Sequence, residues 1–250
     1  MCSSDLEFSD LTIKATTSAL HSMDWSGSGT STWSGVDIIG NAYGWYDLGG
    51  THYWFSSRII NKAGSGVSRC YFTSGVNWFF GSEIVAEATS GPVDDAVAFE
   101  VRTGAEVHVY GGAIRVVVSG AGISTTVNAA RASGTGAEIH IHGTGIDVIS
   151  TPANNIVALS AESGTKIHAN ASAYNLSTGA GGTITRIVNN GGHVHAPYVW
   201  EEHPTPPNIV SVTGADQAVI TQTANGHPSI VIYDASCTSK WYNTGTQACY

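Results

Sequence analysis

Charged residues are scarce in this sequence. Asp, Glu, Lys and Arg make up 12% of its 250 residues, about half the share usual in a soluble protein. The formal net charge at pH 7 is −9. No cluster of Lys or Arg occurs, so we expect no nucleic-acid partner. No apolar run is long enough to cross a membrane as a helix, so no membrane span is expected.

Familiar catalytic motifs are also missing. The sequence contains no Gly-x-Ser-x-Gly, no His-Glu-x-x-His and no phosphate-binding loop. Its acidic pairs, Asp94 with Asp95 and Glu201 with Glu202, are chain neighbours, and neighbouring side chains of a strand point to opposite faces. A glycosidase needs two carboxyl groups on one side of the bond, roughly 5–10 Å apart. The sequence therefore identifies no catalytic residue, no cofactor and no metal site.

Cysteine is rare. Of the four cysteines, Cys2 lies in residues 1–6, a segment that resembles translated sequencing-adaptor DNA. We expect this segment to be an artefact and the chain to be a fragment of environmental sequence, so it is left out of the fold prediction. Cys237 and Cys249 flank a short loop and are a disulfide candidate, with two free thiols as the alternative. Cys70 is expected to be a buried apolar residue.

A repeat dominates the middle of the chain. A six-residue pattern begins at Gly104, Gly136, Gly164 and Gly191. It carries the aligned histidines His108, His140, His168 and His195, which are 32, 28 and 27 residues apart. A period of this length is typical of a solenoid, in which each repeat packs only on its neighbours. Apolar residues flank each histidine, which is the two-residue period of a strand.

Two further apolar runs accompany each repeat. One follows the histidine strand, at Ile114–Val118, Ile146–Ile149 and Tyr174–Leu176. Another precedes it, at Val97–Val101, Thr126–Ala130, Ile156–Ala161 and Ile184–Val188. Such coils predict an all-β fold, a right-handed parallel β-helix, in a single domain. The pattern resembles the pectate-lyase-like β-helix superfamily.

The solenoid is expected to occupy residues 7–203, with a small C-terminal cap in residues 204–250. Three prolines, Pro204, Pro206 and Pro207, mark the boundary because proline cannot donate to a strand ladder. Beyond them, two apolar runs flank Asn225-Gly226 and predict either a hairpin or a last irregular coil.

A second match sets the register of the earlier coils. Residues 55–59 (FSSRI) return as residues 80–84 (FGSEI), 25 residues later. Aligned residues of adjacent coils lie about 4.8 Å apart. Ile59 is then expected on Ile84 inside the coil, with Arg58 beside Glu83 outside. The same alternation predicts that Trp54 and Phe79 point outwards, as a loop-covered pair or an exposed aromatic shelf.

The histidine repeats predict one outward face. If Val107 and Val109 point inwards, their neighbours in each repeat point outwards: Glu106, His108, Tyr110, Glu138, His140, His142, His168 and His195. With Trp54 and Phe79, these are the candidate ligand-binding residues. The face is either a metal-binding or pH-sensitive surface, or a polar ladder. We favour the ladder because its side chains point side by side. A parallel column pairs Arg115 with Asp147.

Three functions remain. The first is a non-catalytic exported module, secreted or on the cell surface, of the surface, adhesive or phage-tail type, with a polysaccharide or cell-surface glycan as its partner. The second is the activity that the family resemblance implies, a polysaccharide lyase or glycoside hydrolase. Its sequence support is an aromatic cluster before the repeats, which is either a glycan groove or core packing. The third is a metal-binding histidine face.

Overall fold

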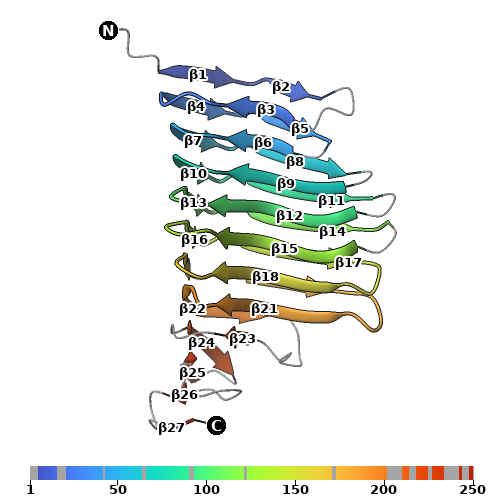
Figure 1. The fold of residues 1–250 in the computed structure, drawn as a ribbon, viewed down its shortest axis with the longest axis vertical. Helices are drawn as coiled ribbons and strands as arrows, with labels where there is room; N and C mark the ends of the chain where they lie inside the picture. Colours follow the sequence, from blue (N-terminus) through green and yellow to red (C-terminus); the bar gives the residue numbers. More distant parts are fainter. Residues whose placement is uncertain are drawn as a thin grey trace.

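The computed structural model is an all-β solenoid (Figure 1). It describes residues 5–15, 21–41, 43–63, 66–89, 93–120, 123–170, 173–201, 210–213, 218–224, 227–233, 242–243 and 248–249. Each coil adds one strand to each of three parallel sheets, and the solenoid makes about six turns. Within the described ranges, no helix is long and apolar enough to cross a membrane.

The three sheets run the length of the solenoid. Sheet A contains β1 (Leu6–Ser9), β4 (Thr30–Ser34), β7 (Thr51–Phe55), β10 (Val76–Phe80), β13 (Glu106–Tyr110), β16 (Glu138–His142), β19 (Lys166–Asn170) and β22 (His193–Glu201). Sheet B contains β2 (Thr12–Lys14), β5 (Asp37–Gly40), β8 (Arg58–Ala63), β11 (Glu83–Ala88), β14 (Ala113–Val118), β17 (Gly145–Ser150) and β20 (Ala173–Ser177). Sheet C contains β3 (His21–Trp25), β6 (Tyr43–Asp47), β9 (Gly66–Phe72), β12 (Val93–Arg102), β15 (Ile123–Ser133), β18 (Asn155–Glu162), β21 (Thr183–Asn190) and β23 (Val210–Thr213).

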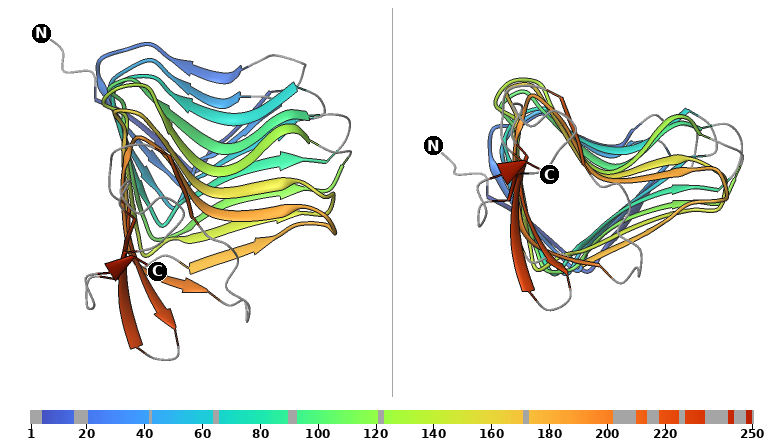
Figure 2. Two further views of the ribbon diagram at one scale, coloured as in Figure 1. Left: turned by 60° about the horizontal axis from the view of Figure 1, so that its bottom comes forward. Right: turned by 90° about the horizontal axis from the view of Figure 1, so that it is seen from below.

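The coils superpose when the molecule is viewed along the stack (Figure 2). The predicted interior column is confirmed: Val107, Ile139, Ile167 and Val194 are register neighbours and have no exposed surface. The apolar runs predicted on either side of each histidine strand form sheets B and C. This agreement follows because a one-residue slip between coils would turn every apolar side chain outwards.

The register predicted for the earlier coils is confirmed as well. Phe55 pairs with Phe80, and Ile59 lies on Ile84 inside the solenoid. Arg58 stands in register between Asp37 and Glu83. It donates two hydrogen bonds to Asp37, at 2.9 and 2.5 Å, rather than pairing with Glu83 as the sequence suggests.

The prediction that Trp54 and Phe79 point outwards is wrong. Both side chains are fully buried, and their rings stack 5.5 Å apart. The reason lies at the corner between sheets A and B, where Ser56 has φ +47° and Gly81 has φ +57°. A left-handed residue at a corner interrupts the alternation of inward and outward side chains. Counting back from Ile59 in sheet B therefore gives the wrong direction for Trp54 in sheet A.

Most of the N-terminal aromatic cluster belongs to the core. Trp33, Trp45 and Trp54 are fully buried and pack on one another at centroid distances of 4.9–5.3 Å. For these residues core packing, and not a glycan groove, is the correct interpretation. Cys70 is also fully buried, and burial raises the pKa of its thiol to about 12, which makes it inert as a nucleophile.

Pairing in the solenoid continues past residue 204. β23 pairs in parallel with β21, and β24 (Ala218–Ala224) pairs in parallel with β22. β24 also pairs antiparallel with β25 (His227–Tyr233), followed by β26 (Tyr242–Asn243) and β27 (Ala248–Cys249). The predicted antiparallel pair is therefore present. Cys237, the three prolines and Asn225-Gly226 lie outside the described residues, so the disulfide and the turn stay predictions.

Candidate functional site

The outer face of sheet A carries two columns of stacked rings. In one, Trp78, His108, His140 and His168 stack at centroid distances of 3.7, 4.4 and 5.0 Å, within 10° of parallel. In the other, Phe55, Phe80, Tyr110 and His142 stack at 5.1, 5.4 and 5.0 Å. The strand register brings these residues together, because each occupies the same place in successive coils. His195 pairs with His168 through the backbone.

A charged column runs beside the rings. Glu106, Glu138 and Lys166 are register neighbours on three coils. Lys166 Nζ donates to Glu138 Oε1 at 2.6 Å, and this hydrogen bond holds the pKa of Glu138 below its usual value. Glu106 Oε1 lies 2.7 Å from His108 Nε2 and 3.5 Å from His140 Nε2. Each charged group of this column therefore has a partner of opposite charge or a hydrogen-bond partner on the same face.

His108 is the most enclosed residue of the face. It lies between the rings of Trp78 and His140 and is only 6% exposed. Its Nε2 donates to Glu106, and its Nδ1 is buried with no hydrogen-bond partner among the described residues. Burial and the nearby His140 lower the pKa of His108, although the bond to Glu106 opposes the shift. The neutral imidazole is thus the favoured form.

Stacking limits what this face can bind. The faces of the inner rings are covered by the rings above and below, so a ligand lying across sheet A meets mainly ring edges. A metal ion faces a similar obstacle, although ligand atoms of Glu106, His108 and His140 lie within 4.8 Å of one another. Imidazole binds a metal in its own plane, and the two ring planes are within 10° of parallel. One ring would have to leave the stack to share an ion.

A second polar cluster lies on the outside of sheet C. Glu100 is fully buried and central: Arg69 Nη1 and Arg102 Nε donate to it, the latter at 2.8 Å. Ser133 Oγ also donates to Glu100, at 2.8 Å. Burial alone would raise the pKa of Glu100, but these bonds and charges outweigh it and lower the pKa. Arg69 also lies 3.2 Å from Asp95.

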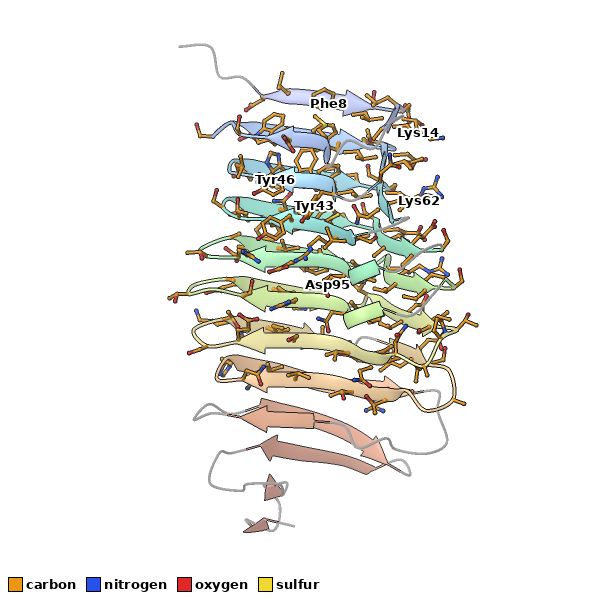
Figure 3. The ribbon with its side chains drawn as sticks, turned by 45° about the vertical axis from the view of Figure 1, so that its right-hand side comes forward. Phe8, Lys14, Tyr43, Tyr46, Lys62 and Asp95 are labelled. Atoms are coloured by element: carbon orange, nitrogen blue, oxygen red, sulfur yellow. The ribbon has the colours of Figure 1, made fainter. Side chains whose placement is uncertain are left out.

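Tyrosines frame this cluster on the N-terminal side. Tyr46 stacks on Tyr71 at 5.2 Å, and the guanidinium of Arg102 lies 4.7 Å from the Tyr71 ring. Tyr43, Tyr46 and Asp95 come to the front together when this side of the solenoid is viewed (Figure 3). Sheet C therefore presents aromatic and charged groups on one surface.

A pocket opens where sheet C ends. Its volume is about 250 Å³, and it is lined by Arg102, Thr103, Arg131, Ser133, Gly134 and Glu162. Arg131 donates to Glu162 Oε1 at 3.2 and 2.6 Å. Burial would lower the pKa of Arg131, but the bond to Glu162 and the charge of Glu100 raise it. We call this feature the corner pocket.

The core holds a chain of Ser, His and Asp side chains. Ser31 Oγ lies 2.6 Å from His52 Nδ1, and His52 Nε2 lies 3.4 Å from Asp47 Oδ1. All three are essentially unexposed. Trp33 Nε1 also donates to the Ser31 hydroxyl at 2.6 Å. No substrate could reach this serine. The row of Ser31, His52 and Asp47 therefore satisfies polar groups inside the core and does not serve nucleophilic catalysis.

The sequence predictions of the site are met in part. The predicted face of sheet A exists, and the predicted pair of Arg115 with Asp147 forms at 3.3 Å. The cluster on sheet C was missed. A signal for it exists in the 31-residue spacing of Glu100, Arg131 and Glu162, together with the alignment of Val97–Val101 on Asn128–Ala132.

Comparison of the chain with protein-family models, with curated proteins and with solved structures gave no match. The fold and the geometry of its surfaces are therefore the basis for a functional proposal.

Proposed function

We propose that this chain is a non-catalytic, glycan-binding structural module of an exported protein, of the surface, adhesive or phage-tail-like type. One observation carries the proposal: the outward polar groups of the described coils bond mainly to their counterparts on adjacent coils. Arg58 bonds Asp37, Lys62 bonds Glu87, Arg115 bonds Asp147 and Lys166 bonds Glu138. Side chains paired between coils hold the coils in register. They do not point together at one place where a substrate bond could react.

A stiff, regular rod of stacked coils suits a displayed protein. Its interior is continuous from Trp33 to Val194, and its outward imidazoles stack from His108 to His140 to His168 on successive coils. Low charge and many Gly, Ser, Thr and Asn residues agree with such a rod. Membership of the pectate-lyase-like superfamily is part of this proposal, since that superfamily is built on the same type of coil.

A second candidate function, a polysaccharide lyase or glycoside hydrolase, is favoured by the cluster on sheet C. There Glu100 and Glu162 share a surface with Arg102 and Arg131, beside a pocket. The electrostatics weigh against it. The pKa of each arginine is raised by its carboxylate partner against the effect of burial, so neither can act as a base. The lowered pKa of Glu100 makes it a poor general acid.

The experiment is a turnover assay paired with a binding assay. The protein is incubated with a panel of neutral and acidic polysaccharides, and new reducing ends and unsaturated products are measured. Retention on the same polysaccharides is measured in parallel. We expect retention without turnover. Turnover that is lost in Glu162→Gln or Glu100→Gln would establish the enzyme instead, and absence of retention on every polysaccharide would remove the glycan-binding role.

A further inference from the structure

The corner pocket is placed by three stacked β-turns. Backbone hydrogen bonds close turns from Arg102 to Ala105, from Gly134 to Ala137 and from Glu162 to Thr165. Each turn leads from a strand of sheet C to a strand of sheet A. The pocket residues therefore stand at the same corner of successive coils, and the rigid sheets on both sides fix their positions.

The size of the pocket limits its occupant. A volume of about 250 Å³ is slightly below the ~300–1,000 Å³ typical of pockets for drug-sized ligands. One ring of a larger molecule fits such a space, with the rest of that molecule outside. The pocket is open to solvent, since Arg102 is 47% exposed and Glu162 is 37% exposed.

The charges at the pocket cancel. Arg102 is paired with Glu100, and Arg131 is paired with Glu162. An anionic ligand would have to compete with these carboxylates for the two guanidinium groups. It would also approach a chain whose net charge is −9. An anionic ligand is therefore disfavoured, and a neutral one meets no such barrier.

The chemistry of the lining matches hydroxyl groups. Guanidinium groups only donate hydrogen bonds, and carboxylates only accept them. The Thr103 hydroxyl does both, whereas the Ser133 hydroxyl donates to Glu100 and can only accept from a ligand. A sugar hydroxyl both donates and accepts hydrogen bonds. It can therefore accept one from the arginine and donate one to the carboxylate of the same pair. Polar groups that face a ligand favour the molecule that satisfies them.

We infer that the corner pocket binds one unit of a neutral glycan. This inference rests on the proposed function, because it names the place and the chemical class of the ligand that the module would hold. It assigns the binding to sheet C and not to the ring columns of sheet A, where stacking covers the ring faces.

The test is calorimetric titration of the protein with neutral gluco-, xylo- and manno-oligosaccharides and with an oligogalacturonate. Thr103→Trp fills the pocket from an exposed turn position. Glu162→Gln keeps the size of the side chain but removes its charge. Asp147→Asn is the matched control, because it weakens the Arg115 ion pair on sheet B, away from the pocket. Circular dichroism melts confirm that each variant is folded.

We expect binding of at least one neutral oligosaccharide, weakened about tenfold or more by Thr103→Trp, a loss of about 1.4 kcal/mol. Glu162→Gln weakens it less, and Asp147→Asn leaves it unchanged. Binding that Thr103→Trp does not weaken overturns the pocket and leaves the proposed function standing. Binding of the oligogalacturonate alone overturns the neutral class. Turnover of any ligand contradicts the proposed function separately.

Discussion

At the scale of the residue, His108 stands between Trp78 and His140 with both faces of its imidazole covered. Protonation would place a cation in this stack, 4.4 Å from the centre of a second imidazole. The partial burial of the ring and the presence of His140 therefore lower the pKa of His108 below 6.5. The same two causes lower the pKa of His142 in the neighbouring column.

The lowered pKa predicts a dependence of stability on pH. A base whose pKa is lower in the folded state than in the unfolded state stabilises the fold above the unfolded pKa, near 6.5. That contribution is lost as the pH falls through the folded pKa. We expect His108→Phe, which keeps a ring in the stack, to reduce the loss of unfolding free energy between pH 7 and pH 5.

Urea denaturation at several pH values measures this slope. Tyr53→Phe is the control, because it alters the same sheet and leaves every histidine in place. Equal slopes for the wild type and His108→Phe would show that protonation of His108 does not cost stability in the folded state.

Trp54 and Phe79 show the limit of residue-by-residue alternation. Within the strands of sheet A the two-residue period holds, and it gave the correct direction for Val107 and Ile139. Across the corner between sheets A and B it fails, because Ser56 and Gly81 adopt positive φ. A sequence shows the alternation of inward and outward side chains inside one strand. It does not show whether that alternation continues across the corner into the next strand.

At the scale of the element, the corner between sheets A and B depends on small residues. Ser57, Ser82 and Thr144 occupy it with buried hydroxyls that hydrogen-bond to backbone carbonyls of the adjoining strands. In the coil between Ser82 and Thr144 the position is held by Gly112. An added Cβ there would lie 2.0 Å from the Ser82 carbonyl oxygen, and φ is +76°.

This geometry predicts that Gly112→Ala is strongly destabilising. Both the left-handed backbone and the clash oppose a side chain, and we expect a loss of at least about 2 kcal/mol in unfolding free energy. Gly104→Ala is the matched control: φ is +74°, but a Cβ there has no neighbour within 4 Å. Chemical denaturation should show a smaller loss for Gly104→Ala. Equal losses would mean that backbone conformation alone sets the cost.

The sheet C cluster shows what an element adds to a sequence. Glu100 and Arg102 alternate with inward Phe99 and Val101 in β12, and yet the Glu100 side chain is fully buried. Only the stacking of β9, β12, β15 and β18 brings Arg69, Arg131 and Glu162 to them. The separation of 31 residues at each step from Arg69 to Glu162 is the signal for this cluster in the sequence.

At the scale of the whole molecule, each coil contacts only its neighbours. The inner coils are covered on both sides, whereas β1 pairs only with β4 among the strands of sheet A. Phe8, Leu11 and Ile13, in and beside the first strands, are only partly buried against the core. Stability in such an array is a sum of coil and interface contributions, so it should fall towards β1.

Hydrogen exchange tests this gradient. We expect the backbone amides of β13 and β16 to exchange most slowly and those of β1 and β2 most rapidly, because end coils open without breaking the interior. Measurement by mass spectrometry after peptic digestion resolves the coils. The same protection in β1 as in β13 would show that the solenoid opens only as one cooperative unit.

The repeats in the sequence were enough to predict the coil. Its period, its two-residue alternation and its aligned glycines fixed the three strands of each repeat and the register of Val107 on Ile139, because interior stacking leaves a strand one acceptable register. The folded structure was needed to show which surfaces carry chemistry relevant to function. The direction of Trp54, the burial of Glu100 and the corner pocket depend on corner geometry and on contacts between coils, and neither is encoded in the pattern of a single strand.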